Sequence, residues 1–528
     1  MHMAMRNHSF SRLFVASALV VAMAGCDITA EPKSTVTDAT IFDDEASYRA
    51  FLAKLYAGLT LTGQQGPDGN ADFGRLDEGF SQYNRQLWQL QELPTDEALI
   101  GWGDAGLPEL TTHLWASSNQ FVQMMFSRIF YQVDLVGEFL RETTDEKLEE
   151  RGHSAVADEV AGYRAEARFL RALSYWHGID LFGDIPLVTE DFGIGSTPPP
   201  QSTRAEIYAY VVSELTEIRD ELPGVGAGQY GRADQGAVAM LLAKLYLNAE
   251  VYVGSAQYAE ALSEIETVIA GPYTLNPDYQ ANFLADNHTS PEFILALPYD
   301  GLRSRTWGGT TFLAHAGCGG SMNAADYGLD FCWAGLRVKP EFVARFPAPQ
   351  DNSPDGRALF YTDGQSLEVT TIPDFVNGWA APKYQNVTSG GAPGSNQTHP
   401  DTDFPMFRLA DAYLMYAEAV LRGGGGSAGQ AVTYINQLRQ RAYGDNSGDI
   451  AAGDLTLDFV LDERGRELWW EGHRRTDLIR FDQFSSAGVW AWKGGTMPGA
   501  PTAATRNLYP IPANEIVANP NLTQNPGY

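Results

Sequence analysis

The chain has 528 residues and a formal net charge of −30, from 36 lysines and arginines against 66 aspartates and glutamates. A surface this acidic repels phosphate backbones, so we expect no nucleic-acid partner. Hydrophobic residues at 44% and charged residues at 19% are typical of a globular protein, neither disordered nor embedded in a membrane.

The first 25 residues have the pattern of a secretory signal peptide. Two arginines precede the apolar run LFVASALVVAMAG, which is short for a membrane span and stops at Cys26. Small residues before this cysteine predict a lipoprotein signal at 1–25 and lipidation of Cys26; the alternative is an ordinary signal peptide cut near Ala24. Residues 26–40 are polar and aperiodic, and we interpret them as the lipidated cysteine and a flexible tether.

Over 41–528 the patterns predict one mostly α domain. The segment 237–252 carries a continuous apolar stripe at helical spacing. Similar stripes occur at 163–182, 203–222, 258–270, 408–424 and 428–444. They form three helix pairs with alanines where neighbouring helices would touch, as in tetratricopeptide repeats. We place the helical repeat pairs at about 118–270 and 405–445.

A long insertion at about 273–405 interrupts the repeat. It is rich in glycine, proline, asparagine and aromatic residues, which predicts loops and short strands. Long irregular connections on a rigid frame are often functional, so we expect the ligand face here. Cys318 and Cys332 lie fourteen residues apart in this insertion. In an exported chain they favour a disulfide over a metal pair, since neither has a second ligand at metal-site spacing.

Short motifs of catalysis are absent from the sequence. GVGAGQYG matches GxGxxG but follows a predicted helix and not a strand, so it is interpreted as a loop. The run from Asp351 begins like a calcium loop, but Thr362 stands where the bidentate glutamate belongs. His177, His315 and His473 fit core or loop roles better than metal ligation. We therefore expect no enzyme, no metal and no cofactor; a surface glycoside hydrolase is the alternative.

The segment ERGRELWWEGHRRTDLIRF, 463–481, holds the densest cluster of charge and aromatic residues. We interpret it as helical, with ion pairs at spacings of three and four and with Leu468, Trp469, Leu478 and Phe481 packed inward. The paired residues would be Arg464, Arg466, Arg474 and Arg475 with Glu463, Glu467, Glu471 and Asp477. Trp470 is also assigned to the core, and an anion site is the alternative.

Five separated motifs, in order, carry a resemblance that runs from the lipoprotein signal to the last residue. They are YRAEARFLRALSYWHGIDLFGDIPLV, GRADQGAVAMLLAKLYLNAEVY, FPMFRLADAYLMYAEAVLR, LWWEGHRRTDLIRF and LYPIPANEIVANPNLTQNPGY. The chain thereby resembles the SusD/RagB family of outer-membrane glycan-binding lipoproteins, and ELPTDEALIGW and TWGGTTF are most similar to the family's starch-binding founder.

This resemblance implies a non-catalytic, surface-exposed protein with four tetratricopeptide-like helix pairs. The fourth pair would come from 118–140 or from the helix near Leu461. It also implies a partner, a TonB-dependent SusC-like transporter that receives the captured oligosaccharide. A lipoprotein that only gates its transporter is an alternative.

By position, the resemblance implies a glycan-binding arc formed by Trp102, Trp307 and Trp333, with Arg85 as the polar contact. Trp307 stands in place of a tyrosine, and Ala105 in place of an asparagine, of the starch-binding founder. Starch or another α-glucan is therefore the favoured ligand, with a fructan or β-glucan as the alternative.

Elementary chemistry agrees with these positions. A pyranose has an apolar face of C–H groups and a rim of hydroxyls, so a flat aromatic ring covers the face and leaves the rim free to hydrogen-bond. Glycines on both sides of Trp102 loosen the backbone that presents its ring. Most of the eleven tryptophans must pack in the core, and core packing is the alternative for each of the three.

Overall fold

The computed structural model describes residues 41–63, 71–74, 76–192 and 197–528. The predicted signal peptide, Cys26 and the tether lie outside these residues. The chain divides into a short unit, Met1–Ser47, and a large unit, Tyr48–Tyr528, which holds the features described below. No helix in the described ranges combines the length and the hydropathy needed to cross a bilayer.

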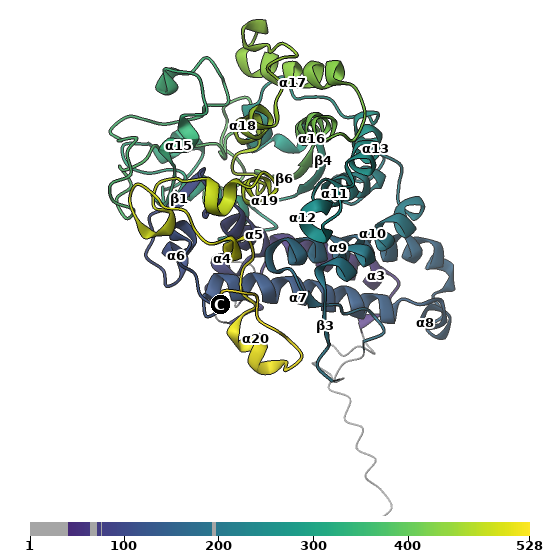
Figure 1. Cartoon of the computed structure of the whole chain (residues 1–528). Coiled ribbons are helices and arrows are strands. Elements are labelled where there is room, and N and C mark those ends of the chain that lie inside the picture. The colour runs from purple at the N-terminus through teal and green to yellow at the C-terminus, as the bar shows by residue number, and fades with distance from the viewer. Residues whose placement is uncertain (1–40, 64–70, 75, 193–196) are drawn as a thin grey trace, which may run out of the picture. The chain divides into compact units, whose positions relative to one another are not determined.

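Helices dominate the large unit, as the sequence predicts (Figure 1). The helices are α3 (Ala46–Thr60), α4 (Glu78–Ser81), α5 (Tyr83–Glu92), α6 (Leu107–Thr112), α7 (Gln120–Glu142), α8 (Asp145–Glu150), α9 (Ala157–Phe182), α10 (Arg204–Ile218), α11 (Gln235–Leu247), α12 (Ala249–Val253), α13 (Tyr258–Ile269), α14 (Gly309–Ala316), α15 (Pro340–Val343), α16 (Leu409–Leu421), α17 (Ala428–Tyr443), α18 (Leu457–Leu468), α19 (Arg474–Arg480) and α20 (Ala513–Ala518).

The predicted helix pairs pack in chain order. Helix α9 packs against α10, α11 against α13, and α16 against α17. Of the two candidates for a fourth pair, 118–140 forms α7, which packs against α9, while the helix near Leu461 is α18, which packs against α16. In Figure 1 α10, α11 and α13 lie on the right of the view and α17 lies at the top, while the segments around α15 and β1 lie to the left.

Two predicted helices end earlier than their apolar stripes. The stripe at 237–252 is split between α11 and α12 because Asn248 leaves the helical conformation and its Nδ2 donates to the Lys244 carbonyl at 2.9 Å. Helix α10 ends at Ile218, and a 3-10 turn leads to Leu222, which is extended. Leu222 precedes Pro223, and a residue before proline avoids the helical region.

In the part of the chain that the structure describes, the strands form three two-stranded antiparallel sheets, two of which join segments more than 100 residues apart. They are β1 (Ala98–Ile100) with β5 (Leu336–Val338), β2 (Ile185–Pro186) with β3 (Gln201–Ser202), and β4 (Phe293–Leu297) with β6 (Phe404–Arg408). Strands β4 and β5 lie in the insertion for which the sequence predicts loops and short strands. The register of β1 and β5 pairs Ile100 with Leu336.

The charged cluster at 463–481 is structural, but most of its predicted local pairing is wrong. Arg466 does bond Glu463 three residues away, at 2.7 Å. Arg474 instead bonds Asp96 at 2.8 Å, and Arg475 bonds Asp180 at 3.0 Å. The helix surface that carries Arg474 and Arg475 is buried against other elements. Their guanidiniums therefore bond carboxylates of the elements packed against it and not carboxylates of the same helix.

The apolar residues of this cluster lie mostly in the core. Trp469 and Trp470 are fully buried, and Leu468 and Leu478 are buried as predicted. Phe481 is only half-buried, which corrects its predicted inward packing. Its ring lies under the guanidinium of Arg422, whose central carbon is 4.7 Å from the ring centroid.

Candidate functional site

Pairing of β1 with β5 brings two of the predicted tryptophans together. Trp102 follows β1 and Trp333 precedes β5, so antiparallel pairing places them side by side although 231 residues separate them. The ring centroids are 6.1 Å apart at an interplanar angle of 48°. The indole Nε1 of Trp102 donates to the Trp333 carbonyl at 3.3 Å. Both side chains are half-buried, so each ring keeps an exposed part.

Trp307 joins this pair from the loop before α14. Its ring centroid lies 6.0 Å from that of Trp333, again at 48°. The buried carboxylate of Glu78 holds the loop: Glu78 Oε2 accepts from Trp307 N, and its Oε1 from Thr306 Oγ1, both at 2.7 Å. Trp307 is also half-buried.

Arg85, in the first turn of α5, completes the predicted set. Its guanidinium carbon lies 3.9 Å from the ring centroid of Phe80 and 4.2 Å from that of Phe312, so the charged group is held between two aromatic rings. Nη1 donates to the Trp307 carbonyl at 3.1 Å. The side chain therefore touches the tryptophan arc directly.

The guanidinium of Arg85 is incompletely satisfied. The residue is 4% exposed, and its buried Nε has no hydrogen-bond partner within the described ranges. Burial lowers the pKa of Arg85 to about 9, against the raising effect of Asp77, Asp104 and Glu78. Because a buried unpaired donor costs free energy, the fold gives up stability at this position.

The four predicted residues line one open cavity of about 300 Å³. Its walls are Asp77, Glu78, Phe80, Arg85, Trp102, Asp104, Trp307 and Trp333. The tryptophans form a tilted arc with Trp333 in the middle, and carboxylates stand at the rim. Such a surface combines flat apolar faces with hydrogen-bonding groups.

Glycines make room for two of the rings. A Cβ at Gly335 would lie 2.6 Å from Trp102 Cε2, and a Cβ at Gly79 would lie 2.6 Å from Trp307 Cβ. Contacts this short are not tolerated, so both positions require glycine for the rings to lie where they do. The glycines beside Trp102 differ: a Cβ at Gly101 would lie 3.2 Å from Arg337 Nη2, while a Cβ at Gly103 would meet nothing within 4 Å.

Four lining residues were not singled out in the sequence: Asp104, two residues after Trp102, and three others at α4. Asp77, Glu78 and Phe80 lie on or next to α4, a four-residue helix without a recognisable motif. Asp77 caps this helix by accepting from Phe80 N at 2.9 Å. The only sequence signal is the run LDEGF before α5, which is too short to indicate a site by itself.

His315 supports the middle ring of the arc. Its imidazole stacks on Trp333 with centroids 4.8 Å apart and an interplanar angle of 22°. Nδ1 lies 2.7 Å from the Phe331 carbonyl oxygen and Nε2 lies 3.0 Å from the Thr398 carbonyl oxygen; a neutral imidazole donates to one of them and an imidazolium to both. Burial lowers the pKa of His315, which the two carbonyls counteract. One face of Trp333 is thus covered by protein.

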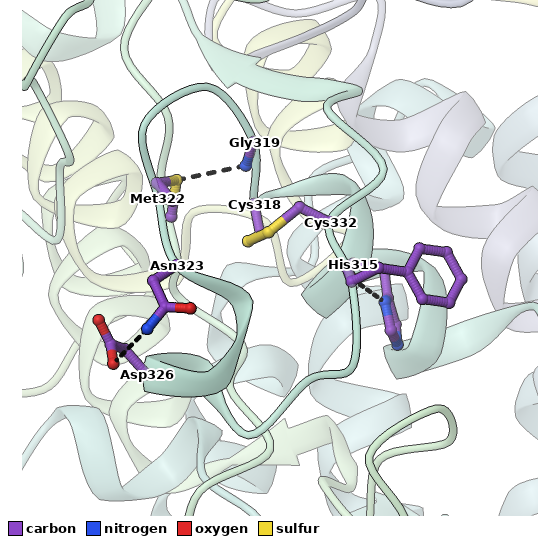
Figure 2. Close-up of a disulfide and its surroundings, with 8 residues drawn as sticks. His315, Cys318, Gly319, Met322, Asn323, Asp326 and Cys332 are labelled. Carbon is purple, nitrogen blue, oxygen red and sulfur yellow. Dashed lines mark hydrogen bonds between the residues drawn. A yellow bond between two sulfur atoms is a disulfide. The ribbon is translucent and has the colours of Figure 1, made fainter.

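Cys318 and Cys332 form a disulfide beside this ring, with Cα atoms 4.9 Å apart (Figure 2). The bridge joins the end of α14 to the residue before Trp333. Cys318 is buried with Met322 and Phe375 in a small apolar cluster. Figure 2 also shows the Met322 sulfur turned toward Gly319, whose N–H donates to it at 3.4 Å.

The remaining sequence motifs do not contribute to the cavity. GVGAGQYG is a loop between α10 and α11, and the run from Asp351 is a turn. His177 is buried and bonds Tyr83 Oη at 2.9 Å, and His473 lies near Lys244. In the described part of the chain, histidine, cysteine and carboxylate side chains form no group of three suited to a metal ion.

Comparison with known proteins decides the family. Residues 375–528 match the model of the SusD family. Over 99% of its length the chain is 33% identical to the starch-binding protein SusD of Bacteroides thetaiotaomicron, and it covers that protein completely. The chain belongs to the SusD family. A further member, SusD-like protein P25 of Formosa agariphila, is 25% identical over 94% of both chains.

Solved structures of the SusD superfamily share the fold. One from Parabacteroides distasonis gives a TM-score of 0.70 at 24% identity, over 94% of this chain and 100% of that one. Surface glycan-binding protein A from Bacteroides thetaiotaomicron, in complex with laminarihexaose, gives 0.67 at 20% identity, over 91% and 99%. At these identities the likeness concerns the fold alone, and it agrees with the mostly helical architecture predicted from the sequence.

Proposed function

We propose that this SusD-family protein binds an oligosaccharide at the cavity of Trp102, Trp307, Trp333 and Arg85, with a starch-like α-glucan as the favoured ligand. The observation that carries the proposal is the convergence of three half-buried tryptophans on one buried, incompletely bonded arginine. The rings supply the apolar faces that a pyranose needs, and Arg85 supplies donors for its hydroxyls.

The strength of such binding follows from the area covered. A sugar that covers about 50 to 100 Å² of one ring gains about 1 to 3 kcal/mol. One ring is insufficient after the cost of immobilising the ligand. Three rings in contact reach micromolar to millimolar dissociation constants, on the order of −8 to −4 kcal/mol.

The shape of the arc favours a curved ligand. Trp102 and Trp307 are each tilted by 48° from Trp333, so the three rings do not share a plane. A helically curved α-glucan presents successive sugar faces in different directions, whereas a flat chain does not. The structural relative that holds laminarihexaose makes a β-glucan the main alternative, followed by a fructan.

Calorimetric titration of the soluble form that starts after Cys26 tests the ligand. We expect maltoheptaose to bind more tightly than laminarihexaose, a cellooligosaccharide or a fructan. Trp102→Ala with Trp333→Ala should remove binding while the circular dichroism spectrum stays unchanged. A folded protein that binds no maltooligosaccharide would reject the α-glucan assignment, and tight binding of another glycan would replace it.

Binding without catalysis is the second part of the proposal. Glu78, the most buried carboxylate of the cavity, is committed to Thr62, Thr306 and the Trp307 backbone and serves to hold the loop. Incubation with the bound glycan should release no new reducing ends. Turnover by the purified protein, lost in Glu78→Gln, would instead establish a glycoside hydrolase.

The cellular role in the proposal is that of a cell-surface lipoprotein of the outer membrane, anchored through Cys26, that delivers the oligosaccharide to a TonB-dependent SusC-like transporter. The lipoprotein signal and membership of the SusD family support it. Affinity purification from detergent-solubilised outer membranes should recover a TonB-dependent barrel, and Cys26→Ala should release the protein from the membrane fraction. If Trp102→Ala with Trp333→Ala leaves uptake unchanged, the protein only gates its transporter.

A further inference from the structure

An exposed aromatic ring extends the tryptophan arc beyond the cavity. Phe331 is 47% exposed, and its ring centroid lies 6.3 Å from that of Trp333. This spacing matches the 6.0 and 6.1 Å that separate Trp333 from the other two rings. Of the exposed large apolar side chains in the described ranges, Phe331 is the one whose ring contacts a cavity tryptophan.

The local backbone turns Phe331 and Trp333 to the same side. His315 contacts both rings, with centroid distances of 5.3 Å to Phe331 and 4.8 Å to Trp333. Cys332, between them, is directed to Cys318 and closes the disulfide (Figure 2). The two aromatic side chains therefore stand on His315, while the intervening residue anchors the segment to the protein.

The segment is also fixed by its backbone. Trp333 N donates to the His315 carbonyl and Ala334 N to the Cys318 carbonyl, both at 2.8 Å. With the disulfide and the contact of His315 Nδ1 with the Phe331 carbonyl oxygen, the backbone that carries the Phe331 ring is held in place before any ligand arrives. A preorganised ring loses little conformational freedom on binding, so most of its contact free energy is retained.

We infer that Phe331 is an outer subsite, which stacks on one additional sugar of an oligosaccharide already held by Trp102, Trp307 and Trp333. The inference rests on the proposed function. The exposed neighbour Asp330 accepts from Thr398 Oγ1 at 2.5 Å and offers its remaining lone pairs to sugar hydroxyls. The subsite makes the protein selective for chain length, since a short oligosaccharide fills the cavity without reaching Phe331.

Titration with maltotriose and maltoheptaose tests the subsite. Phe331→Ala should weaken maltoheptaose binding about fivefold to tenfold, the effect of uncovering one ring face, and change maltotriose binding less than about twofold. Phe331→Tyr, which keeps a flat ring, should restore the wild-type preference. Leu302→Ala is the matched control, because Leu302 is an exposed apolar residue, 64% accessible, in the same insertion.

The outcomes separate the two proposals. Unchanged maltoheptaose affinity in Phe331→Ala, or an equal loss for both ligands, overturns the outer subsite. Cavity binding still stands in that case if Trp102→Ala with Trp333→Ala removes it. If the wild type binds neither ligand, the α-glucan proposal fails as well. Phe331→Ala and its Leu302→Ala control are then titrated with a short and a long member of whichever glycan series the protein binds. An equal loss of affinity for both members in Phe331→Ala overturns the subsite.

Discussion

Two regions of the molecule use the same residue types, arginine and tryptophan, in opposite ways. In the core beside α18, Arg408 bonds Glu292, Glu467 and Glu471 at 2.6 to 2.7 Å. All these side chains are at most 1% exposed. At the cavity, Arg85 has no ion-pair partner in the described part of the chain, and its Nε is unbonded. Trp469 and Trp470 are fully buried, whereas the three cavity tryptophans are half-buried.

The difference lies in the ion pairs: the core arginine bonds three carboxylates and the cavity arginine bonds none in the described part of the chain. A buried charge without a partner is costly, so a stable protein pairs its arginines wherever stability is the only requirement. Arg85 departs from this rule among its aromatic neighbours. Buried Arg337 also lacks a carboxylate partner, but its guanidinium donates to the carbonyls of Ile372 and Asp374. Such a local departure is what we expect of a surface completed by a ligand.

The largest effect should come from breaking the satisfied region. Arg408→Met takes one of the cationic partners from each of three buried carboxylates and should lower the free energy of unfolding by about 3 to 5 kcal/mol. Urea denaturation measures the loss. Arg303→Met is the control, because Arg303 is 87% exposed beside Asp300 and should change stability by less than about 0.5 kcal/mol. If the two variants were equally stable, buried and exposed arginines would not differ in their contribution to the free energy of unfolding, which would contradict this prediction.

Lowering the pH should weaken the same network of buried ion pairs. Burial raises the pKa of Glu463, but Arg357, Arg466 and Arg439 outweigh it and bring the value to about 2. A depressed carboxylate stabilises the fold above its unfolded pKa and loses that contribution as the pH falls toward 2. We expect a loss of about 2 to 3 kcal/mol from this group between pH 5 and pH 2, measured by denaturation at stepped pH. A free energy of unfolding that stays constant between pH 5 and pH 2 would contradict this prediction.

Removing a ring of the tryptophan arc should change the free energy of glycan binding and not the free energy of unfolding, and by a smaller amount. Trp102→Ala should weaken maltoheptaose binding about 10-fold to 100-fold, because it removes one stacked face of about 1 to 3 kcal/mol. The melting temperature should stay close to that of the wild type, since the ring is half-exposed. Trp470→Ala provides the contrast: a fully buried ring whose loss should cost about 3 to 5 kcal/mol of stability.

Arg85 gives the sharpest contrast with Arg408. Arg85→Met keeps the stem between Phe80 and Phe312 but removes an unpaired buried charge, so stability should be unchanged or slightly higher. Affinity for the glycan should fall about tenfold with the loss of a charged donor, worth about 1.5 kcal/mol. Calorimetry and urea denaturation of one sample give both values. A destabilisation as large as that of Arg408→Met would assign Arg85 a structural role.

Much of the helical frame could be predicted from the sequence, because apolar stripes at helical spacing record which face is buried. The end of α11 was missed because the apolar stripe continues past Asn248, where a side-chain bond to Lys244 interrupts the helix. The ion pairs of 463–481 were assigned to near neighbours because local spacing is all that a sequence displays. Partners such as Asp96 and Asp180 become neighbours only through packing.

At the cavity, the residues found from the sequence were those with a matching motif in the family. Trp102, Trp307, Trp333 and Arg85 do line one cavity, and their role as a glycan site stays a prediction. His315 and Phe331 were not linked to the site, because their contact with Trp333 depends on how the disulfide loop folds back onto α14. A single sequence carries no sign of that contact.

A crystal structure of the protein with maltoheptaose tests the central claim most directly. We expect sugar rings stacked on the exposed faces of Trp102, Trp307 and Trp333, a hydroxyl oxygen about 3 Å from Arg85, and one further sugar over Phe331. Maltoheptaose bound at another surface, with the cavity empty at saturating ligand, would contradict the claim that the unsatisfied arginine and its aromatic arc form the capture site.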